Sequence, residues 1–177
     1  MRAKQNIPHV GFPPSIIARM SQSPPVHETQ VRVRYGEVDR MAVVYHANYL
    51  VYFEQGRTEY LRSLGGTYRR LEEEGTLLVV VETGVKHHKP AQYDDLLTVR
   101  TRLTKLKPIR MRFDYEVLRG DVLLASGFTV LASTDAEGRP RRVPSTFRER
   151  ITSGVPAGNG KNGSPAAFQG APPRRAD

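Results

Sequence analysis

The chain has 177 residues, of which 38% are hydrophobic and 25% are charged, and this suits one compact domain rather than two. No run approaches the ~18 apolar residues that a membrane-spanning helix requires, and the absence of cysteine excludes disulfides, thiol nucleophiles and thiolate metal sites. The formal net charge of +9 is spread over both ends and the middle of the chain, so we do not expect a nucleic-acid-binding face.

The two ends of the chain differ in composition from the middle. Residues 1–28 are rich in proline, and residues 152–177 are rich in Gly, Pro and Ala, so we expect a flexible arm and a flexible tail around one domain at residues 29–151. The apolar pieces of the arm are shorter than a secretory signal, and the absence of cysteine suits a reducing compartment, so we expect a cytoplasmic protein. Because Met20 begins a shorter reading frame, the sequence leaves open whether residues 1–19 belong to the native start.

The first half of the domain predicts a strand, a loop and a long helix. Apolar and polar side chains alternate over residues 29–35, which is typical of a half-buried strand. Over residues 46–64 the apolar side chains recur every three or four positions and predict an amphipathic helix. Gly65 and Gly66 end it, because glycine readily takes the left-handed conformation of a C-cap. The apolar face of this helix consists of Tyr49, Phe53, Gly56, Tyr60 and Leu64.

The second half predicts a short helix followed by strands. The helix is expected at residues 68–74, and residues 143–150 are expected to form a short closing segment. Apolar runs and alternating patterns predict four strands, at residues 77–85, 97–106, 109–118 and 122–133. The dipeptide Gly120-Asp121 is typical of the tight turn of a β-hairpin.

This order of elements indicates the fold class. One strand, one long helix and four strands with short connections predict an α+β domain, in which a curved, mainly antiparallel sheet of about five strands wraps around the helix. Such a sheet has exposed edges, which proteins often pair between subunits, so we expect a homodimer or a larger homo-oligomer.

The loop before the long helix carries the residues best suited to catalysis. Two carboxylates, Glu37 and Asp39, precede His46 and Asn48 at the start of the helix. A helix start presents unpaired N–H groups, which favour a carbonyl oxygen that becomes negative during reaction. A carboxylate nearby could attack the carbonyl carbon or activate water, as in acyl-transfer hydrolysis. The residues alone leave a purely structural role open, with Asp39 in a turn and Asn48 as a helix cap.

The same region resembles a known family. The stretches that carry the resemblance are Val31–Asp39, Val43–Leu50, Tyr52–Glu54, Arg57–Leu61, Pro90-Ala91, Asp94-Asp95 and Leu97. They resemble the 4-hydroxybenzoyl-CoA thioesterase family of hot-dog-fold acyl-CoA thioesterases, in its Tol-Pal-cluster branch, from Thr29 to near Arg150. The resemblance implies a hot-dog fold, dimers or tetramers with active sites at the subunit interface, and hydrolysis without a metal or another cofactor.

The resemblance also implies roles for individual residues. Asp39 matches the family's catalytic aspartate, which acts as nucleophile on the thioester carbonyl or as base for water. The backbone N–H of His46 would polarise the thioester oxygen, and Tyr45 and Asn48 would shape the same substrate pocket. The family usually has glycine where Ala42 stands, and an alanine there would be strained if the position requires a positive φ.

Other polar residues offer alternative sites. Glu54 is a rival catalytic carboxylate, because another hot-dog branch takes its acid from the central helix. The favoured interpretation is a structural one, in which Glu54 pairs with Arg57 or with Thr58 and arginines across a dimer. Glu37 lies in a turn and is expected to be solvated. The adjacent His87 and His88 would point to opposite faces of a strand, so we expect no metal site there.

The expected substrate is an acyl-CoA ester, cleaved to a free acid and CoA. Its phosphates require cations, for which the arginines of residues 139–142 or Lys105 and Lys107 are candidates. An acyl-carrier-protein thioesterase and a non-catalytic module that binds acyl ligands or partner proteins remain alternatives. The sequence leaves open the preferred acyl chain, the cations that meet CoA, and the choice between dimer and tetramer.

Overall fold

The structure is a computed structural model that describes residues 25–153. The arm predicted for residues 1–28 and the tail predicted for residues 152–177 lie almost entirely outside this range. Within it, the first strand begins at His27 and the last helix ends at Ser153. No helix between residues 25 and 153 is long and apolar enough to cross a membrane.

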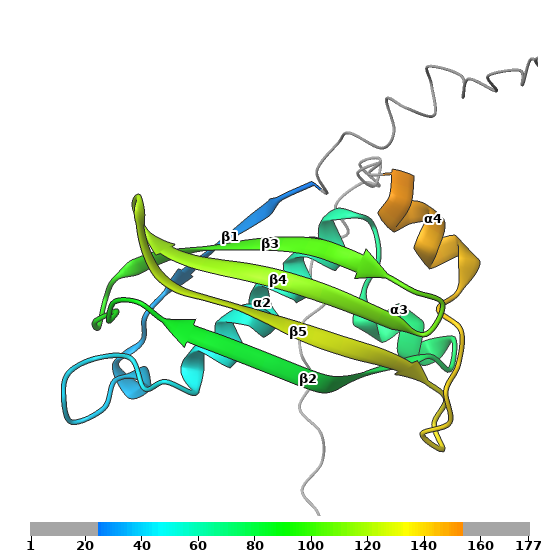
Figure 1. Cartoon of the computed structure of the whole chain (residues 1–177), viewed down its shortest axis with the longest axis horizontal. Helices are drawn as coiled ribbons and strands as arrows, with labels where there is room; N and C mark the ends of the chain where they lie inside the picture. The colour runs from blue at the N-terminus through cyan, green and yellow to red at the C-terminus, as the bar shows by residue number, and fades with distance from the viewer. Residues whose placement is uncertain (1–24, 154–177) are drawn as a thin grey trace, which may run out of the picture.

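Five strands form one curved sheet along the long helix, as Figure 1 shows. Every pair of neighbouring strands is antiparallel, and the order in the sheet is β1-β3-β4-β5-β2. The strands are β1 (His27–Arg32), β2 (Leu77–His87), β3 (Leu96–Leu106), β4 (Arg110–Arg119) and β5 (Val122–Thr134). The predicted α+β fold is therefore confirmed, with β1 and β2 at the two edges of the sheet.

The long helix, α2 (Asn48–Ser63), lies against the concave face of the sheet. Its side of the sheet receives every second side chain of the strands, as the alternating burial of β4 shows. The rings of Phe53 and Tyr115 stack with their centroids 4.4 Å apart. The helix ends where the sequence predicted, since Gly65 adopts a φ of +72°. The buried face of α2 consists of Tyr49, Tyr52, Phe53, Gly56, Arg57, Tyr60 and Leu61.

At Gly56 the helix comes unusually close to the sheet. A Cβ atom added there would lie 2.5 Å from Thr101 Oγ1 and 2.8 Å from Val99 Cγ1, both on β3. Because any side chain would collide with β3, glycine at this position sets how deeply α2 can lie in the sheet.

Two shorter helices close the end of the domain away from the start of α2 (Figure 1). The first, α3 (Tyr68–Glu73), begins after Thr67, whose hydroxyl accepts a hydrogen bond from the N–H of Arg70 at 3.2 Å. The closing segment predicted at residues 143–150 is the second helix, α4 (Ser145–Ser153).

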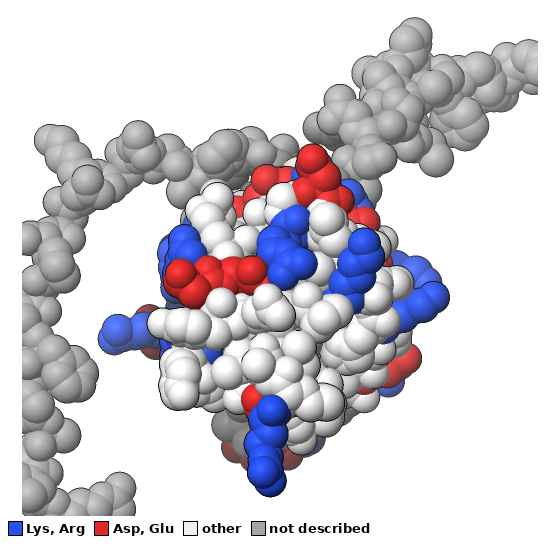
Figure 2. Space-filling view, turned by 90° about the vertical axis from the view of Figure 1, so that its left-hand side faces the viewer, with Lys and Arg blue, Asp and Glu red and all other residues white. Residues whose placement is uncertain are grey.

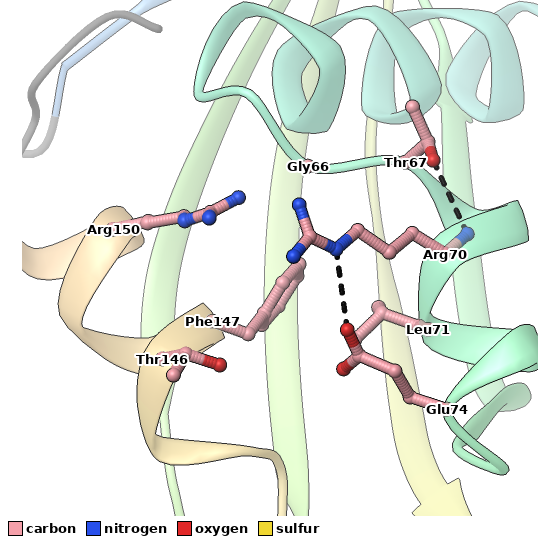
Figure 3. A pocket seen from close by; sticks show the side chains of 8 residues that line it. All are labelled: Gly66, Thr67, Arg70, Leu71, Glu74, Thr146, Phe147 and Arg150. Atoms are coloured by element: carbon pink, nitrogen blue, oxygen red, sulfur yellow. Dashed lines mark hydrogen bonds and ion pairs between the residues drawn. The ribbon is translucent and has the colours of Figure 1, made fainter.

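The contact between α3 and α4 is shown in Figure 3. The ring of Phe147 on α4 is buried and lies opposite α3, next to the side chain of Leu71. Arg150 donates a hydrogen bond to the carbonyl of Gly65 at 2.9 Å, which ties α4 to the end of α2. The small cleft left between these helices is lined by residues that hold the fold together, and it lies far from the loop predicted to be catalytic.

Candidate active site

The loop that carries Asp39 is held by backbone hydrogen bonds. It begins with a short 3-10 helix, Tyr35–Glu37, and then folds back on itself. The N–H of Asp39 donates to the carbonyl of Val43 at 2.9 Å, and the N–H of Val44 donates to the carbonyl of Ala91 at 2.8 Å. The loop is therefore an ordered structure, attached on one side to the segment that follows β2.

The left-handed position of the loop is occupied by Ala42. Its φ is +59°, so the position does require the conformation that glycine adopts more easily, as the sequence comparison with the family suggested. The path of the loop is thus kept although alanine replaces glycine. The strain is local, since the N–H of Ala42 still donates to the carbonyl of Asp39 at 2.9 Å.

Replacing Ala42 by Gly is expected to raise the free energy of unfolding by about 1 kcal/mol. The left-handed region costs an L-residue about 1–2 kcal/mol, and the greater freedom of glycine in the unfolded chain offsets part of this gain. Urea unfolding measures the difference. The matched control is Ala136→Gly, at an exposed turn position whose φ is not positive, which is expected to lower stability; equal effects of the two substitutions would contradict the argument.

Asp39 and His46 line the same open groove. The walls of this groove come from the loop, from the start of α2, and from the end of β2 with the segment after it. The carboxylate of Asp39 is half-buried, and its Oδ1 accepts a hydrogen bond from the N–H of Met41 at 2.7 Å. No Lys, Arg or His between residues 25 and 153 forms an ion pair with it, so the carboxylate is available for chemistry. The lining residues are Asp39, Met41, Val43, Val44, His46, Tyr49, His87, His88, Lys89 and Pro90.

Two backbone N–H groups are free at the start of α2. The helix begins at Asn48 with Ala47 as its N-cap, two residues later than predicted. In the described part of the chain, the N–H groups of His46 and Ala47 donate to no acceptor. The next N–H, that of Asn48, donates to the carbonyl of Tyr45 at 2.9 Å. A substrate oxygen in the groove can therefore find an unused donor at His46, as an oxyanion site requires.

Tyr45 and Asn48 do not line this groove. The side chain of Tyr45 is 48% exposed and lies against the ring of His46, with centroids 4.3 Å apart. The amide of Asn48 turns to the loop instead and donates from Nδ2 to the carbonyl of Glu37 at 2.8 Å. The assignment of Tyr45 and Asn48 to the substrate pocket stays a prediction. Within a single chain, the hydrogen bond of Asn48 holds the loop that contains Glu37.

Glu54 lies on the exposed side of α2, outside the groove. The ion pair with Arg57 favoured from the sequence does not form. Arg57 is buried and donates hydrogen bonds to three uncharged hydroxyl groups, those of Tyr68, Tyr115 and Thr129. The ion pair with Arg57 was wrong because the guanidinium is buried among these hydroxyl groups while Glu54 is exposed; pairing of Glu54 across a dimer stays a prediction.

Glu37 is the residue near the site that the sequence analysis missed. It was expected to be solvated, but it is only 7% exposed. Its Oε1 accepts hydrogen bonds from Nε and Nη2 of Arg34, at 2.8 and 2.7 Å. Its Oε2 accepts from the N–H of Arg34 at 2.8 Å and from the hydroxyl of Tyr52 at 3.0 Å. The spacing of Arg34 and Glu37, three residues apart, could have indicated their ion pair. The contact with Tyr52 could not be predicted in this way, because Tyr52 belongs to α2.

These hydrogen bonds decide the charge of Glu37. Burial raises the pKa of its carboxyl, but the hydrogen bonds from Arg34 and Tyr52 outweigh burial and hold the pKa below its ordinary value. Burial and the neighbouring Glu37 carboxylate raise the pKa of Tyr52, so its hydroxyl stays protonated and donates. Since the Glu37 pKa is lowered on folding, this network stabilises the fold above the ordinary pKa of about 4.3 and loses that effect as the pH falls through the native value.

The two histidines at the end of β2 both line the groove. The ring of His87 packs edge-on against Tyr49, with centroids 4.9 Å apart. His88 lies just beyond the strand, and its Nε2 is 2.9 Å from Ser126 Oγ. No group of three or more metal-binding side chains occurs among residues 25–153.

The basic turns considered for CoA phosphates lie at the other end of the sheet. Arg139 pairs with Asp135 at 2.8 Å, and Arg141 donates to the carbonyl of Gly75 at 2.6 Å. This turn lies beside the start of β2 (Figure 1), whereas the end of β2 and the residues after it line the groove. The 11 residues of β2 separate the two by about 33 Å, at a rise of about 3.3 Å per residue.

Figure 2 shows the end of the molecule to which the loop of Asp39 belongs. Uncharged atoms cover its centre, and Lys and Arg side chains project around that area together with Asp and Glu side chains. The groove of Asp39 includes one of the cations at this end, Lys89. An uncharged surface beside isolated cations suits a ligand with an apolar acyl part and an anionic part.

Comparisons with known proteins agree with the fold. The thioesterase superfamily matches residues 41–126, a segment that begins just after Asp39 and includes His46. Acyl-CoA thioesterase YbgC of Haemophilus influenzae is 40% identical over 106 residues, which cover 59% of this chain and 78% of that protein. A chloroplastic acyl-acyl carrier protein thioesterase of Arabidopsis thaliana is 30% identical, over 71% of this chain and 67% of that protein. The crystal structure of DHNA-CoA thioesterase from Staphylococcus aureus has a TM-score of 0.70 and 28% identity, and the match covers 72% of this chain and 89% of that one.

Proposed function

Because this chain belongs to the thioesterase superfamily, we propose that it hydrolyses acyl-CoA thioesters to a free acid and CoA through Asp39 and the backbone N–H of His46. The observation that carries the proposal is the groove in which a carboxylate and a backbone N–H group occur together; within residues 25–153 the carboxylate pairs with no cation and the N–H donates to no acceptor. The relative in Haemophilus influenzae, named as an acyl-CoA thioesterase, supports the substrate class.

The chemistry follows from these two groups. The thioester oxygen accepts a hydrogen bond from the N–H of His46, which stabilises the negative charge that develops on it. As a base, Asp39 removes a proton from water, the water oxygen bonds to the carbonyl carbon, and the C–S bond breaks to release CoA thiolate, which takes up a proton. As a nucleophile, Asp39 bonds to the carbonyl carbon itself, releases the thiolate and leaves a mixed anhydride, which water then cleaves.

A panel of short, long and aromatic acyl-CoA esters tests the proposal. Release of thiol is followed with a thiol reagent, and at least one ester is expected to turn over. Binding of acyl-CoA without thiol release would instead establish a non-catalytic module, and no binding at all would refute the substrate class.

A carrier-protein substrate is the second candidate. The relative in Arabidopsis thaliana, named as an acyl-acyl carrier protein thioesterase, favours it. The reacting group would be the same thioester, presented by phosphopantetheine on a protein. Comparing kcat/KM for one acyl group on CoA and on acyl carrier protein separates the two, since the preferred carrier gives the higher value.

We further propose that two copies of the chain pair through β2. This strand has a neighbour, β5, on one side only, and its residues Val79, Val80 and Val81 are 46%, 46% and 50% exposed. Three adjacent valines on an open edge favour pairing with another strand. A twofold axis would pair the two β2 strands antiparallel and continue the sheet across both copies.

Replacing Val80 by Lys is expected to shift the protein from dimer to monomer in sedimentation velocity, because a charge is placed in the proposed contact. The matched control is Gln30→Lys on the exposed opposite edge, β1, which is expected to leave the dimer intact. A monomeric wild-type protein, or a dimer that tolerates Val80→Lys, would refute pairing through β2.

A further inference from the structure

We propose that Glu37 is a positioning residue for the hydrolysis, which fixes the loop carrying Asp39 to the first turns of α2. The proposal rests on the proposed function, because it names what holds the reacting carboxylate in place. It assigns a role to a buried charge that the reaction itself does not use.

Glu37 connects the loop to α2 through both its side chain and its backbone. Oε2 of the carboxylate accepts a hydrogen bond from the hydroxyl of Tyr52 at 3.0 Å. The backbone carbonyl accepts from Nδ2 of Asn48 at 2.8 Å and from the N–H of Tyr45 at 2.9 Å. Two residues of the first turns of the helix therefore bind one residue of the loop.

Asp39 has no such links of its own. Within residues 25–153 its hydrogen bonds all go to other loop residues, namely Met41, Ala42 and Val43. The place of its carboxylate relative to the free N–H of His46 is thus set by the anchors of the loop. Glu37, two residues before Asp39, is the anchor that reaches α2.

The carboxylate is held in one orientation by donors on both of its oxygens. The guanidinium of Arg34 donates to Oε1, while the N–H of Arg34 and the hydroxyl of Tyr52 donate to Oε2. Glutamine has nearly the same shape but presents an NH₂ group in place of one oxygen. That group would face either the guanidinium or the backbone N–H of Arg34 as donor against donor, so the anchor would loosen.

The test compares Glu37→Gln, Tyr52→Phe and the double variant with wild type, using the best ester of the panel. Glu37→Gln is expected to lower kcat about tenfold with KM within about twofold of wild type, because the substrate still binds while the carboxylate is misplaced. The double variant is expected to be no slower than Glu37→Gln, since both changes break the same hydrogen bond. Assays are run well below the unfolding temperature of each variant.

The matched control is Glu28→Gln on β1. Glu28 also pairs with an arginine, Arg100 at 2.7 Å, but it is exposed and belongs to another part of the sheet. The kcat of Glu28→Gln is expected to equal that of wild type. Equal kcat values for Glu37→Gln and Glu28→Gln, or fully additive losses in the double variant, would overturn the positioning role.

Hydrogen exchange gives a readout that does not depend on activity. In Glu37→Gln the N–H groups of Asp39 and Val44 are expected to exchange faster, while those of β4 stay unchanged. Unchanged exchange in the loop overturns the positioning role whether or not the protein is active. A wild type that cleaves no ester while its loop loosens in Glu37→Gln refutes the proposed function alone.

Discussion

Replacing Asp39 by Asn is expected to lower kcat for acyl-CoA hydrolysis by about a thousandfold, with KM changed by less than about threefold. The amide can neither attack the thioester carbonyl nor accept a proton from water. It can still accept the hydrogen bond from the N–H of Met41, so the loop and the groove are expected to persist. Steady-state kinetics and the urea unfolding curve together check that chemistry is lost while the fold is kept.

Glu54→Gln is the control that decides between the two candidate carboxylates. Glu54 is exposed on α2 and lies outside the groove, so its substitution is expected to leave kcat unchanged. Full turnover by Asp39→Asn together with loss in Glu54→Gln would move the catalytic role to the helix.

A single turnover in ¹⁸O-labelled water tests the nucleophilic role of Asp39. If Asp39 forms an anhydride that water attacks at the aspartyl carbon, the label enters Asp39 and is found there by mass spectrometry of its peptide. Label in the released acid alone fits a base, or an anhydride that water attacks at the acyl carbon.

The largest effect on stability is expected from Gly56→Val, which should lower the free energy of unfolding by about 3 kcal/mol. The new side chain would meet Thr101 and Val99 at distances that real atoms do not reach. Both neighbours are β-branched and stiff, so they cannot turn aside, and α2 must lift from the sheet. Urea unfolding measures the loss.

The matched control for this change is Gly36→Val. An added Cβ at Gly36 meets nothing within 4 Å, so the same side chain is expected to change stability by less than about 0.5 kcal/mol. Comparable losses at the two positions would show that the close approach at Gly56 is not what limits the packing of α2.

The sequence was sufficient for features that depend on local periodicity. The apolar residues of α2 recur at helical spacing, and Gly56 was placed on the buried face although its close contact with β3 was not foreseen. The alternation of β4 and the Gly65 end of α2 followed from equally local rules.

What the sequence did not predict depends on partners distant in the chain. The burial of Glu37 requires Tyr52, fifteen residues later on another element, and the neutral partners of Arg57 lie on α3, β4 and β5. The far wall of the groove, His87 to Pro90, reaches Asp39 only because the sheet curves around α2. Contacts of this kind depend on how whole helices and strands pack. They therefore cannot be predicted from the type of residue that stands in a turn.

If two copies pair through β2 as proposed, the separation of the groove from the basic turns along that strand is expected to make the kinetics depend on protein concentration. When two β2 strands pair antiparallel, the start of one lies beside the end of the other, and the turn of Arg139 and Arg141 in each copy approaches the groove of its neighbour. Each copy would then hold the nucleotide of the other's substrate. Dilution below the dimer dissociation constant would raise KM for CoA esters, while a small thioester without a nucleotide would be cleaved as before.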